Sequence, residues 1–585
     1  MMIEFPPGWI IIIGALLIPI TQGLLRQAVL VALPVFALTL IWTLPDNALW
    51  QTSFLEYTLS PLDFSTVGKL FATIFSLMVL VGGIFAMRTA STLELSAAFL
   101  YAGSAIGVTS SGDLISVFIY WELMAIGSTA VIWAGATNSA YKASMRYLFM
   151  HLFGGVILMA GILWHIHETG STEFTALELA GPAQCLILIG FLVNAGAPPF
   201  SAWIADAYPE ASPSGSVFLS AFTTKTAVFT LLIAFPGTSI LIPIGCFMIF
   251  YGIIYALLEN DARRILSYSI VNQVGFMITG IGIGTEMALN GAAAHAFAHI
   301  VYKALLLMTA GAVLYRTGKR RCSDLGGLFH SMPIKTLYGI IGALAISSFP
   351  FTSGFVSKSM ISSSAAYEHI TWVWFLLAAA SAGVFLHAGV KYPWFVFFQK
   401  DSGLRPEEPP RNMQFAMFIF AFLCIALGVF PQPLYDLLPY PVDYEPYTAD
   451  HLVTQFQLLL FAGLAFFLLL PMMKRTETIS LDFDWFYRKL GAKLVMGVGR
   501  KVYAVYAKQE QAFVNTLKSL VTHVYDADKN KPKGSVARMW PIETMVFWVA
   551  ILLCGYLIVY YIYMFSRLKR SKFQPARFAI FIPFS

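Results

Sequence analysis

The stretch that decides the fold is FPFTSGFVSK, residues 349–358, inside the apolar run 335–366. A run of this length crosses a bilayer, which needs roughly 20 apolar residues per helix. Pro350 and Gly354 interrupt the helix and leave backbone amides and carbonyls that only a protein-enclosed or hydrated cavity satisfies. Lys358 follows the break, where a charge costs roughly 3 kcal/mol on insertion scales. The stretch therefore predicts a functional cavity inside a membrane protein.

A second apolar run, residues 183–207, is interrupted in the same way by GAPP at residues 196–199. Gly196, Pro198 and Pro199 all disfavour a continuous helix. One such break is typical of a simple proline kink. Two breaks five helices apart are typical of transporters built from inverted repeats, so their spacing favours a transporter.

The composition extends this interpretation to most of the chain. Hydrophobic residues make up 58% of the 585 residues and charged residues only 12%, about half the usual share of a soluble domain. Apolar runs lie at about residues 8–24, 27–44, 66–87, 93–111, 114–134, 145–166, 183–207, 213–234, 240–258, 263–284, 289–315, 335–366, 371–398, 413–430, 452–472 and 543–565. We therefore expect an all-α integral membrane protein with about sixteen transmembrane helices. The net charge of +6 forms no long basic stripe, so no nucleic-acid partner is expected.

The loop charges predict the orientation of the chain. With the N-terminus outside, nearly all loop lysines and arginines fall on the inner side and the acidic residues on the outer side. We expect a multi-pass protein of a bacterial inner membrane. The tail after the last helix conflicts with this, because it carries Arg567, Lys569, Arg570, Lys572 and Arg577 although an even helix count puts it outside. Either the helix count is off by one near the C-terminus, or a partner holds the tail.

Ionisable side chains inside the apolar runs form the predicted proton path. They are Glu122, Lys225, His295, His299, Lys303, Lys358, His387 and Lys391. His295, His299 and Lys303 follow one another at i, i+4 and i+8, which stacks them on one helix face. His387 and Lys391 repeat the i, i+4 spacing. Side chains this costly to bury at mid-depth indicate a functional site.

The chemistry that these residue types support is proton relay. Burial disfavours the charged form of lysine and glutamate alike, so a pair that separates and re-forms has two protonation states of similar energy. Histidine relays between them because it titrates near physiological pH. Simpler roles compete at two positions. Lys391 lies near a helix end, where its ammonium group can reach the interface, and a lone membrane histidine such as His151 is more often a packing residue.

The sequence indicates neither a cofactor nor a metal. The five cysteines form no C-x-x-C pair, which argues against an iron–sulfur cluster or a structural zinc site. His295 and His299 lack carboxylate partners for a metal. Because there is also no phosphate-binding loop or nucleophile motif, we do not expect the chain to be an enzyme by itself.

These residues stand in motifs that resemble the proton-translocating, antiporter-like subunits shared by Mrp-type multisubunit Na⁺/H⁺ antiporters and respiratory complex I. The resemblance covers residues 60–435, with the motifs YWEL (120–123), PFSAWIADA (199–207), RRILSYS (263–269), HIVYKAL (299–305), DLGGL (324–328) and SGFVSK (353–358). It implies a fourteen-helix core with two inverted five-helix repeats, each with one broken helix. By motif position it implies that Glu122, Lys225 and Lys358 are the charged residues of the fifth, eighth and twelfth helices. His299 and Lys303 would be central relay residues.

The chain departs from this family in its first half. The family's lysine of the seventh helix falls near Asn194, and the histidine of its Pro-x-His-x-Trp motif is Ser201. The usual lysine partner of Glu122 is therefore missing. Either Lys225 takes the place of that partner, or the first half-channel is weak. Asp206 supplies a charge near the break, in a role that looks structural.

The runs and the resemblance together predict six parts of the chain. These are the N-terminal helices (1–92), the first inverted repeat with its break near 196–200 (93–234), the second with its break near 349–354 (240–398), the C-terminal core helices (399–475), a polar amphipathic segment (476–540), and the last transmembrane helix with the basic tail (541–585). The amphipathic segment is either a long helix on the cytoplasmic membrane face or along a neighbouring subunit, or a loosely ordered linker.

The function that these patterns favour is translocation of protons, with Na⁺ as a possible second ion, by one subunit of a monovalent cation/H⁺ antiporter. The lysine at position 358 resembles the Mrp D-type subunit more than the complex I subunit with glutamate there. A proton-pumping subunit of a redox complex and a degenerate channel kept as an assembly scaffold stay open as alternatives. In each case the expected partners are other integral-membrane subunits, the lipid bilayer, protons and monovalent cations.

Overall fold

The computed structural model describes residues 5–45, 48–472, 481–529 and 542–572. It divides the chain into two compact units, Met1–Phe483 and Asp484–Ser585. The part boundaries expected at 475/476 and 540/541 lie outside the described residues, and so does Arg577 of the basic tail.

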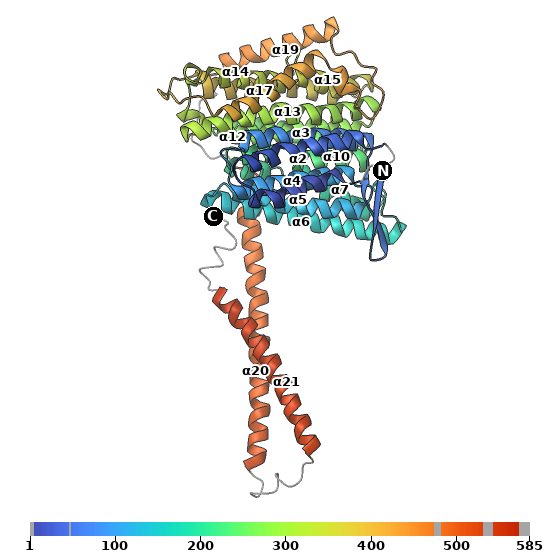
Figure 1. Ribbon diagram of the computed structural model, residues 1–585, viewed down its shortest axis with the longest axis vertical. Coiled ribbons are helices and arrows are strands. Elements are labelled where there is room, and N and C mark those ends of the chain that lie inside the picture. Colours follow the sequence, from blue (N-terminus) through green and yellow to red (C-terminus); the bar gives the residue numbers. More distant parts are fainter. Residues whose placement is uncertain (1–4, 46–47, 473–480, 530–541, 573–585) are drawn as a thin grey trace. The chain divides into compact units, whose positions relative to one another are not determined.

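The first half of the first unit begins with apolar helices around a small hairpin (Figure 1). These are α1 (Pro7–Leu17), the 3₁₀ turn η1 (Ile18–Ile20), α2 (Gly23–Thr43), β1 (Leu49–Phe54), β2 (Tyr57–Asp63) and α3 (Thr66–Ala86). Then follow α4 (Thr92–Ser110), α5 (Leu114–Trp133), α6 (Asn138–Thr169), α7 (Pro182–Ala195), α8 (Ala202–Ala207), η2 (Tyr208–Glu210), α9 (Gly215–Ala221) and α10 (Thr223–Ala234).

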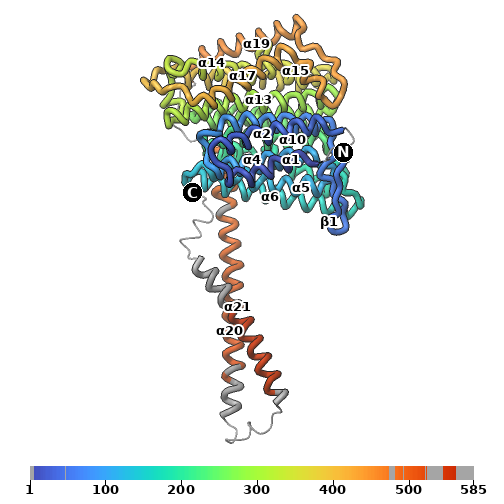
Figure 2. The backbone as a smooth tube through the Cα atoms, in the orientation of Figure 1, coloured from blue at the N-terminus to red at the C-terminus, as the bar shows by residue number. Residues whose placement is uncertain are grey.

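The second half of this unit packs its helices around α13. It contains α11 (Leu241–Leu258), α12 (Ala262–Ile283), α13 (Glu286–Thr317), η3 (Cys322–Asp324), η4 (Leu328–His330), α14 (Pro333–Ile346), α15 (Ser353–Tyr367), α16 (Thr371–Val384) and the π-helices η5 (Phe385–Lys391) and η6 (Trp394–Phe398). It ends with α17 (Arg411–Val429), α18 (Gln432–Tyr435) and α19 (Ala449–Leu468). Figure 2 shows α1, α4, α5 and α6 on one side of α13 and α14, α17 and α19 on the other.

The expected helical membrane fold is confirmed. Among the described residues, eleven helices are long and apolar enough to cross a membrane. Each apolar run of the sequence coincides with a helix or a pair of helices. The antiparallel hairpin, which pairs Leu49 with Asp63 and Phe54 with Tyr57, was not expected. Its turn contains neither of the residues Asn and Gly that usually mark a hairpin, and Leu55 itself adopts a positive φ of 55°.

Both predicted helix breaks are present, and a third occurs without a proline or glycine. Helix α7 ends at Gly196, whose φ of 77° suits glycine, and α8 begins only at Ala202. Helix α14 ends at Ile346 and α15 begins at Ser353. The third break separates α9 from α10 at Phe222, whose backbone angles are −95° and −69°.

The two central helices are shielded from lipid. The most apolar stretch of α12 is fully buried and that of α13 is 94% buried, whereas α2 and α19 are buried over only 22% of theirs. A helix surrounded by protein can carry polar side chains that a lipid-facing helix cannot. The fold therefore places the histidines and lysine of α13 where buried polar groups can find partners.

The second unit contains the π-helical turn η7 (Phe486–Gly491), α20 (Ala492–Lys529) and α21 (Ile542–Lys572). Helix α20 covers most of the residues for which the sequence predicts a long helix. Its apolar side chains, such as Val498, Val502 and Phe513, are exposed within this unit. Whether the helix lies on a membrane face or along a neighbouring subunit stays a prediction.

Candidate functional site

Two buried lysines bind backbone carbonyls that the helix breaks leave free. Lys225 Nζ donates to Ser220 O at 2.6 Å, just before the break at Phe222, and to Thr224 Oγ1 at 3.1 Å. Lys358 Nζ donates to the carbonyl of Ile346, the last residue of α14, at 3.0 Å. The partly negative C-terminal end of a helix favours an ammonium group. The same device therefore holds a lysine in each half of the unit.

The other two lysines of the predicted path are also held by neutral oxygens. Lys303 Nζ donates to Ser269 Oγ at 2.9 Å and to Leu266 O at 3.4 Å. Lys391 Nζ donates to three carbonyls at the end of α11, those of Ala256, Leu257 and Glu259, at 2.6–3.1 Å. It is buried at 4% exposure and caps α11 rather than reaching the membrane interface.

None of these four ammonium groups forms an ion pair with a carboxylate of the described residues. Loss of a proton from such a lysine weakens its hydrogen bonds to neutral oxygens but leaves no carboxylate without its counter-charge. A lysine locked to a carboxylate would instead strand a buried charge, which costs several kcal/mol. The arrangement thus suits groups that change protonation.

A chain of side-chain hydrogen bonds crosses from α15 to the π-helix η5. It starts at Ser357, whose Oγ lies 3.2 Å from His295 Nδ1, and His295 Nε2 lies 3.0 Å from Gln273 Oε1. Gln273 Nε2 donates to Asn272 Oδ1 at 2.5 Å, and Asn272 Nδ2 lies 3.1 Å from His387 Nε2. The chain thus joins His295 and His387, which the sequence alone places on separate helices.

The hydrogen-bond partners indicate which ring nitrogen of His387 and of His295 carries the proton. His387 Nδ1 lies 2.8 Å from Gly383 O and must donate to it, so its Nε2 accepts from Asn272. His295 donates through Nε2 to Gln273, and its Nδ1 faces the hydroxyl of Ser357, which also donates to the carbonyl of Ser353 at 2.9 Å. Side-chain amides neither gain nor lose protons readily, so Asn272 and Gln273 orient the histidines rather than conduct.

His387 and Lys391 lie four residues apart on a segment that is π-helical rather than α-helical. The segment Phe385–Lys391 is a π-helix, which has more residues per turn than an α-helix. His387 contacts Asn272 of α12, and Lys391 contacts the end of α11. The i, i+4 stacking expected for this pair stays a prediction, and π-helical turns are frequent at functional sites.

His299 is fully buried, and neither of its ring nitrogens has a hydrogen-bond partner. It lies one turn from His295 and one turn from Lys303 on α13. Buried polar atoms in native proteins are nearly always paired, so an unpaired ring at this point is a candidate for transient proton transfer. The expected grouping of these three residues along one helix is thus retained, and His299 is its least constrained member.

Glu122 does not meet Lys225. It is half-buried on α5, and its Oε1 has no hydrogen-bond partner. The carboxylate lies against α6, because a Cβ placed on Gly155 would stand only 1.9 Å from Glu122 Oε1. The alternative in which Glu122 answers directly to Lys225 is therefore not what this geometry shows.

The first broken helix is braced by polar contacts. Trp203 Nε1 donates to Val193 O at 3.0 Å and satisfies a carbonyl near the end of α7. Arg146 forms two parallel hydrogen bonds to Asp206, at 2.7 and 2.9 Å, which tie α6 to α8. This agrees with a structural role for Asp206. Asn194 is fully buried, and its Oδ1 lies 2.7 Å from His151 Nδ1.

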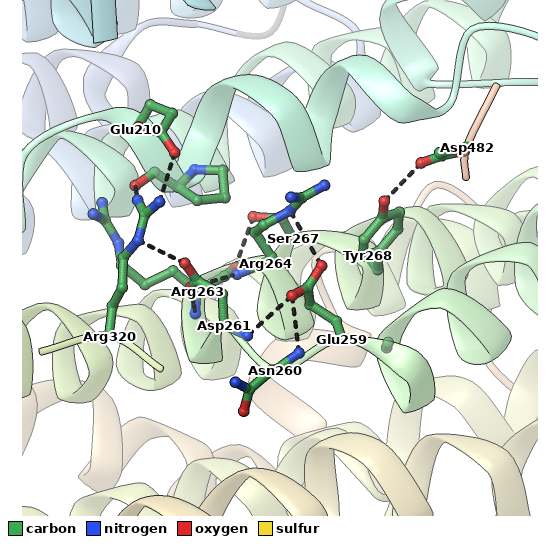
Figure 3. Close-up of polar contacts among 12 residues, drawn as sticks. Glu210, Glu259, Asn260, Asp261, Arg263, Arg264, Ser267, Tyr268, Arg320 and Asp482 are labelled. Carbon is green, nitrogen blue, oxygen red and sulfur yellow. Dashed lines mark hydrogen bonds and ion pairs between the residues drawn. The ribbon is translucent and has the colours of Figure 1, made fainter. Parts of the chain in front are cut away.

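An ionic cluster links the loop after α8 to the start of α12 (Figure 3). Arg320 forms ion pairs with Glu210 at 2.9 Å and with Asp261 at 2.7 Å. Burial raises the pKa of Asp261 above its usual range, although Arg320 opposes the shift. On the same helix, Tyr268 donates to Asp482 at 2.6 Å, which attaches the end of the first unit to α12. These contacts join the two halves of the unit.

Three comparisons place this architecture among known proteins. The family described as NADH:quinone oxidoreductase/Mrp antiporter, TM, matches residues 111–385. The D-type subunit of the Na(+)/H(+) antiporter of Alkalihalophilus pseudofirmus is 29% identical over 51% of this chain and 66% of its own length. NADH-quinone oxidoreductase subunit M of Pseudomonas aeruginosa is 28% identical over 57% of this chain and 71% of its own.

A solved structure shares the fold. A chain of the Mrp complex from Dietzia sp. DQ12-45-1b superposes with a TM-score of 0.75 at 20% identity, over 94% of this chain and 66% of that one. The matched family region contains both helix breaks and every residue of the predicted path except His387 and Lys391. Residues 111–385 of this multi-pass integral membrane protein therefore match the NADH:quinone oxidoreductase/Mrp antiporter transmembrane family.

Proposed function

We propose that this chain is the proton-translocating subunit of a multisubunit monovalent cation/H⁺ antiporter in a bacterial inner membrane. The observation that carries the proposal is the set of buried lysines without counter-charges among the described residues, together with the two buried histidines of α13. Lys225, Lys303 and Lys358 are at most 2% exposed, and each is held by neutral oxygens. Structural lysines at such depth normally pair with carboxylates.

In this proposal protons move along the middle of the unit. Lys225, on α10, receives a proton from the first half and passes it to His299, which has two free ring nitrogens. Lys303 follows one turn later on α13, and Lys358 is the terminal acceptor beside the break of α14. His295, Gln273 and Asn272 keep the neighbouring rings oriented. Lys391 has a structural role because its ammonium group caps α11.

The partners in this proposal are other membrane subunits that bind the exchanged cation. A redox-driven pump is the second candidate, and the similarity to NADH-quinone oxidoreductase subunit M favours it. The two candidates share the path within this chain and differ in what drives it.

The deciding experiment measures proton flux with a pH-sensitive dye in inverted vesicles that contain the whole complex. Na⁺ and K⁺ are tested as drivers for the wild type, Lys303→Ala, Lys358→Ala and, as a structural control, Lys391→Ala. Cation-driven flux that is lost in Lys358→Ala supports the antiporter. Proton movement that appears only after a reductant is added would support the redox pump instead. Cation-driven flux that Lys358→Ala and Lys303→Ala leave intact would contradict the path.

A further inference from the structure

Among the described residues, several polar atoms without partners lie on α5, α6, α7 and just before α8. They are Trp121 Nε1, Glu122 Oε1, His151 Nε2, Asn194 Nδ2 and Ser201 Oγ. His151, Asn194 and Ser201 are at most 1% exposed. Native proteins leave few buried polar atoms unpaired, and such groups call for an explanation such as bound water or proton transfer. Those that packing contacts bring together indicate a site.

Packing contacts bring three of these residues together. Glu122 lies against Gly155 of α6, and His151 is one turn away on that helix, about 5–6 Å between Cβ positions. The neighbouring Gly154 is packed by Val193 of α7, and Asn194 follows Val193 in the chain. Figure 1 shows α5, α6 and α7 as neighbouring helices of the first unit.

Asn194 determines which nitrogen of His151 is basic. The amide Oδ1 lies 2.7 Å from Nδ1 and can only accept, so Nδ1 carries the proton. The lone pair is then on Nε2, the nitrogen without a partner. A neutral histidine with a free Nε2 is an acceptor for a proton from a nearby carboxylic acid.

A polar route continues from His151 toward Lys225. The ring of His151 packs on that of Tyr147, with centroids 4.0 Å apart. Tyr147 OH lies 3.1 Å from Thr223 Oγ1, and Thr224, the next residue, binds Lys225 Nζ at 3.1 Å. The first half therefore reaches the central lysines through side chains of α6 and α10.

We propose that Glu122 and His151 form a proton-exchanging pair, with Asn194 as the residue that positions His151. In the exchange, the O–H bond of the Glu122 carboxylic acid breaks as an N–H bond forms at His151 Nε2. The products are a carboxylate and an imidazolium, and the reverse step restores the neutral pair. This inference rests on the proposed function and assigns the first half of the path to a histidine that its sequence context marked as a packing residue.

The test compares His151→Gln with the double variant His151→Gln/Asn194→Lys in the assembled complex. General acid–base groups typically contribute at least about a hundredfold, so His151→Gln should reduce cation-driven flux by at least about two orders of magnitude. Asn194→Lys introduces an ammonium group on α7 at the position that contacts residue 151, and it should restore much of the loss. His167→Gln, an exposed position on the same helix, is the matched control and should keep wild-type flux.

The outcomes separate this inference from the proposed function. Wild-type flux in His151→Gln would overturn the pair while leaving the antiporter intact. Equal losses in the single and double variants, with the complex assembled to wild-type levels, would overturn it as well, since a packing defect is not repaired by a charge. A wild-type complex that moves no protons with any driver would refute the proposed function itself.

Discussion

Replacing Gly155 by alanine tests whether the position of the Glu122 carboxylate matters. The added Cβ would stand 1.9 Å from Glu122 Oε1 and 2.9 Å from its Cδ. Ordinary contact begins near 3.4 Å, so the oxygen must retreat by about 1.5 Å. Glu122 is half-buried, and its side chain can rotate away from α6 at little cost in stability. The free energy of unfolding should therefore change by less than about 1 kcal/mol.

Proton flux should respond much more strongly than stability. A displacement of about 1 Å at a reacting group can reduce a rate about a hundredfold, so Gly155→Ala should lower cation-driven flux by that order. The assay is dye-monitored flux in inverted vesicles, with thermal unfolding of the purified complex measured in parallel. Gly154→Ala is the control, because its Cβ would meet Val193, at 3.0 Å from Cγ1 and 3.3 Å from Cβ, and not Glu122. Wild-type flux in Gly155→Ala would refute a role for the Glu122 carboxylate at this position.

Three further predictions follow from the contacts of single side chains. Lys358→Met should abolish cation-driven flux in an assembled complex. Lys391→Met should mainly lower the unfolding temperature measured by calorimetry, because it removes a cap from α11, and the reverse pattern in the two variants would contradict both roles. Gln273→Leu should slow flux at least about tenfold because His295 loses its oriented partner, and unchanged vesicle flux would show that the amide chain is dispensable. Arg320→Met should destabilise the unit by about 1–3 kcal/mol because Asp261 stays buried without its ion pair, which urea unfolding measures against Lys319→Met as a control.

Several features of the site could be predicted because each depends on local sequence. Proline and glycine mark the breaks at 196–199 and 350–354, and a lysine within an apolar run identifies a costly charge wherever the helices pack. The i, i+4 spacing on α13 follows from helix geometry alone. The break at Phe222 has no such local signal, because no proline or glycine marks it.

Contacts between segments far apart in the sequence could not be predicted. Nothing local indicates that Asn194 meets His151, 43 residues earlier, or that Asn272 meets His387, 115 residues later. The π-helix at 385–391 likewise has no local signal that an argument based on α-helical spacing uses. In the part of the chain that the structure describes, these long-range contacts determine which ring nitrogens are free and which lysines are only structural.

The sequence by itself determined that this protein is a bundle of membrane-spanning helices with charged residues at mid-depth. It could do so because hydropathy, helix breaks and the cost of burying a charge are properties of short segments. Only the tertiary structure decided how those charges are used. It placed Lys225 and Lys358 on the carbonyls of broken helices, kept Glu122 apart from Lys225, and turned His151 toward Asn194. Which polar groups form hydrogen bonds with one another depends on how segments far apart in the chain pack together.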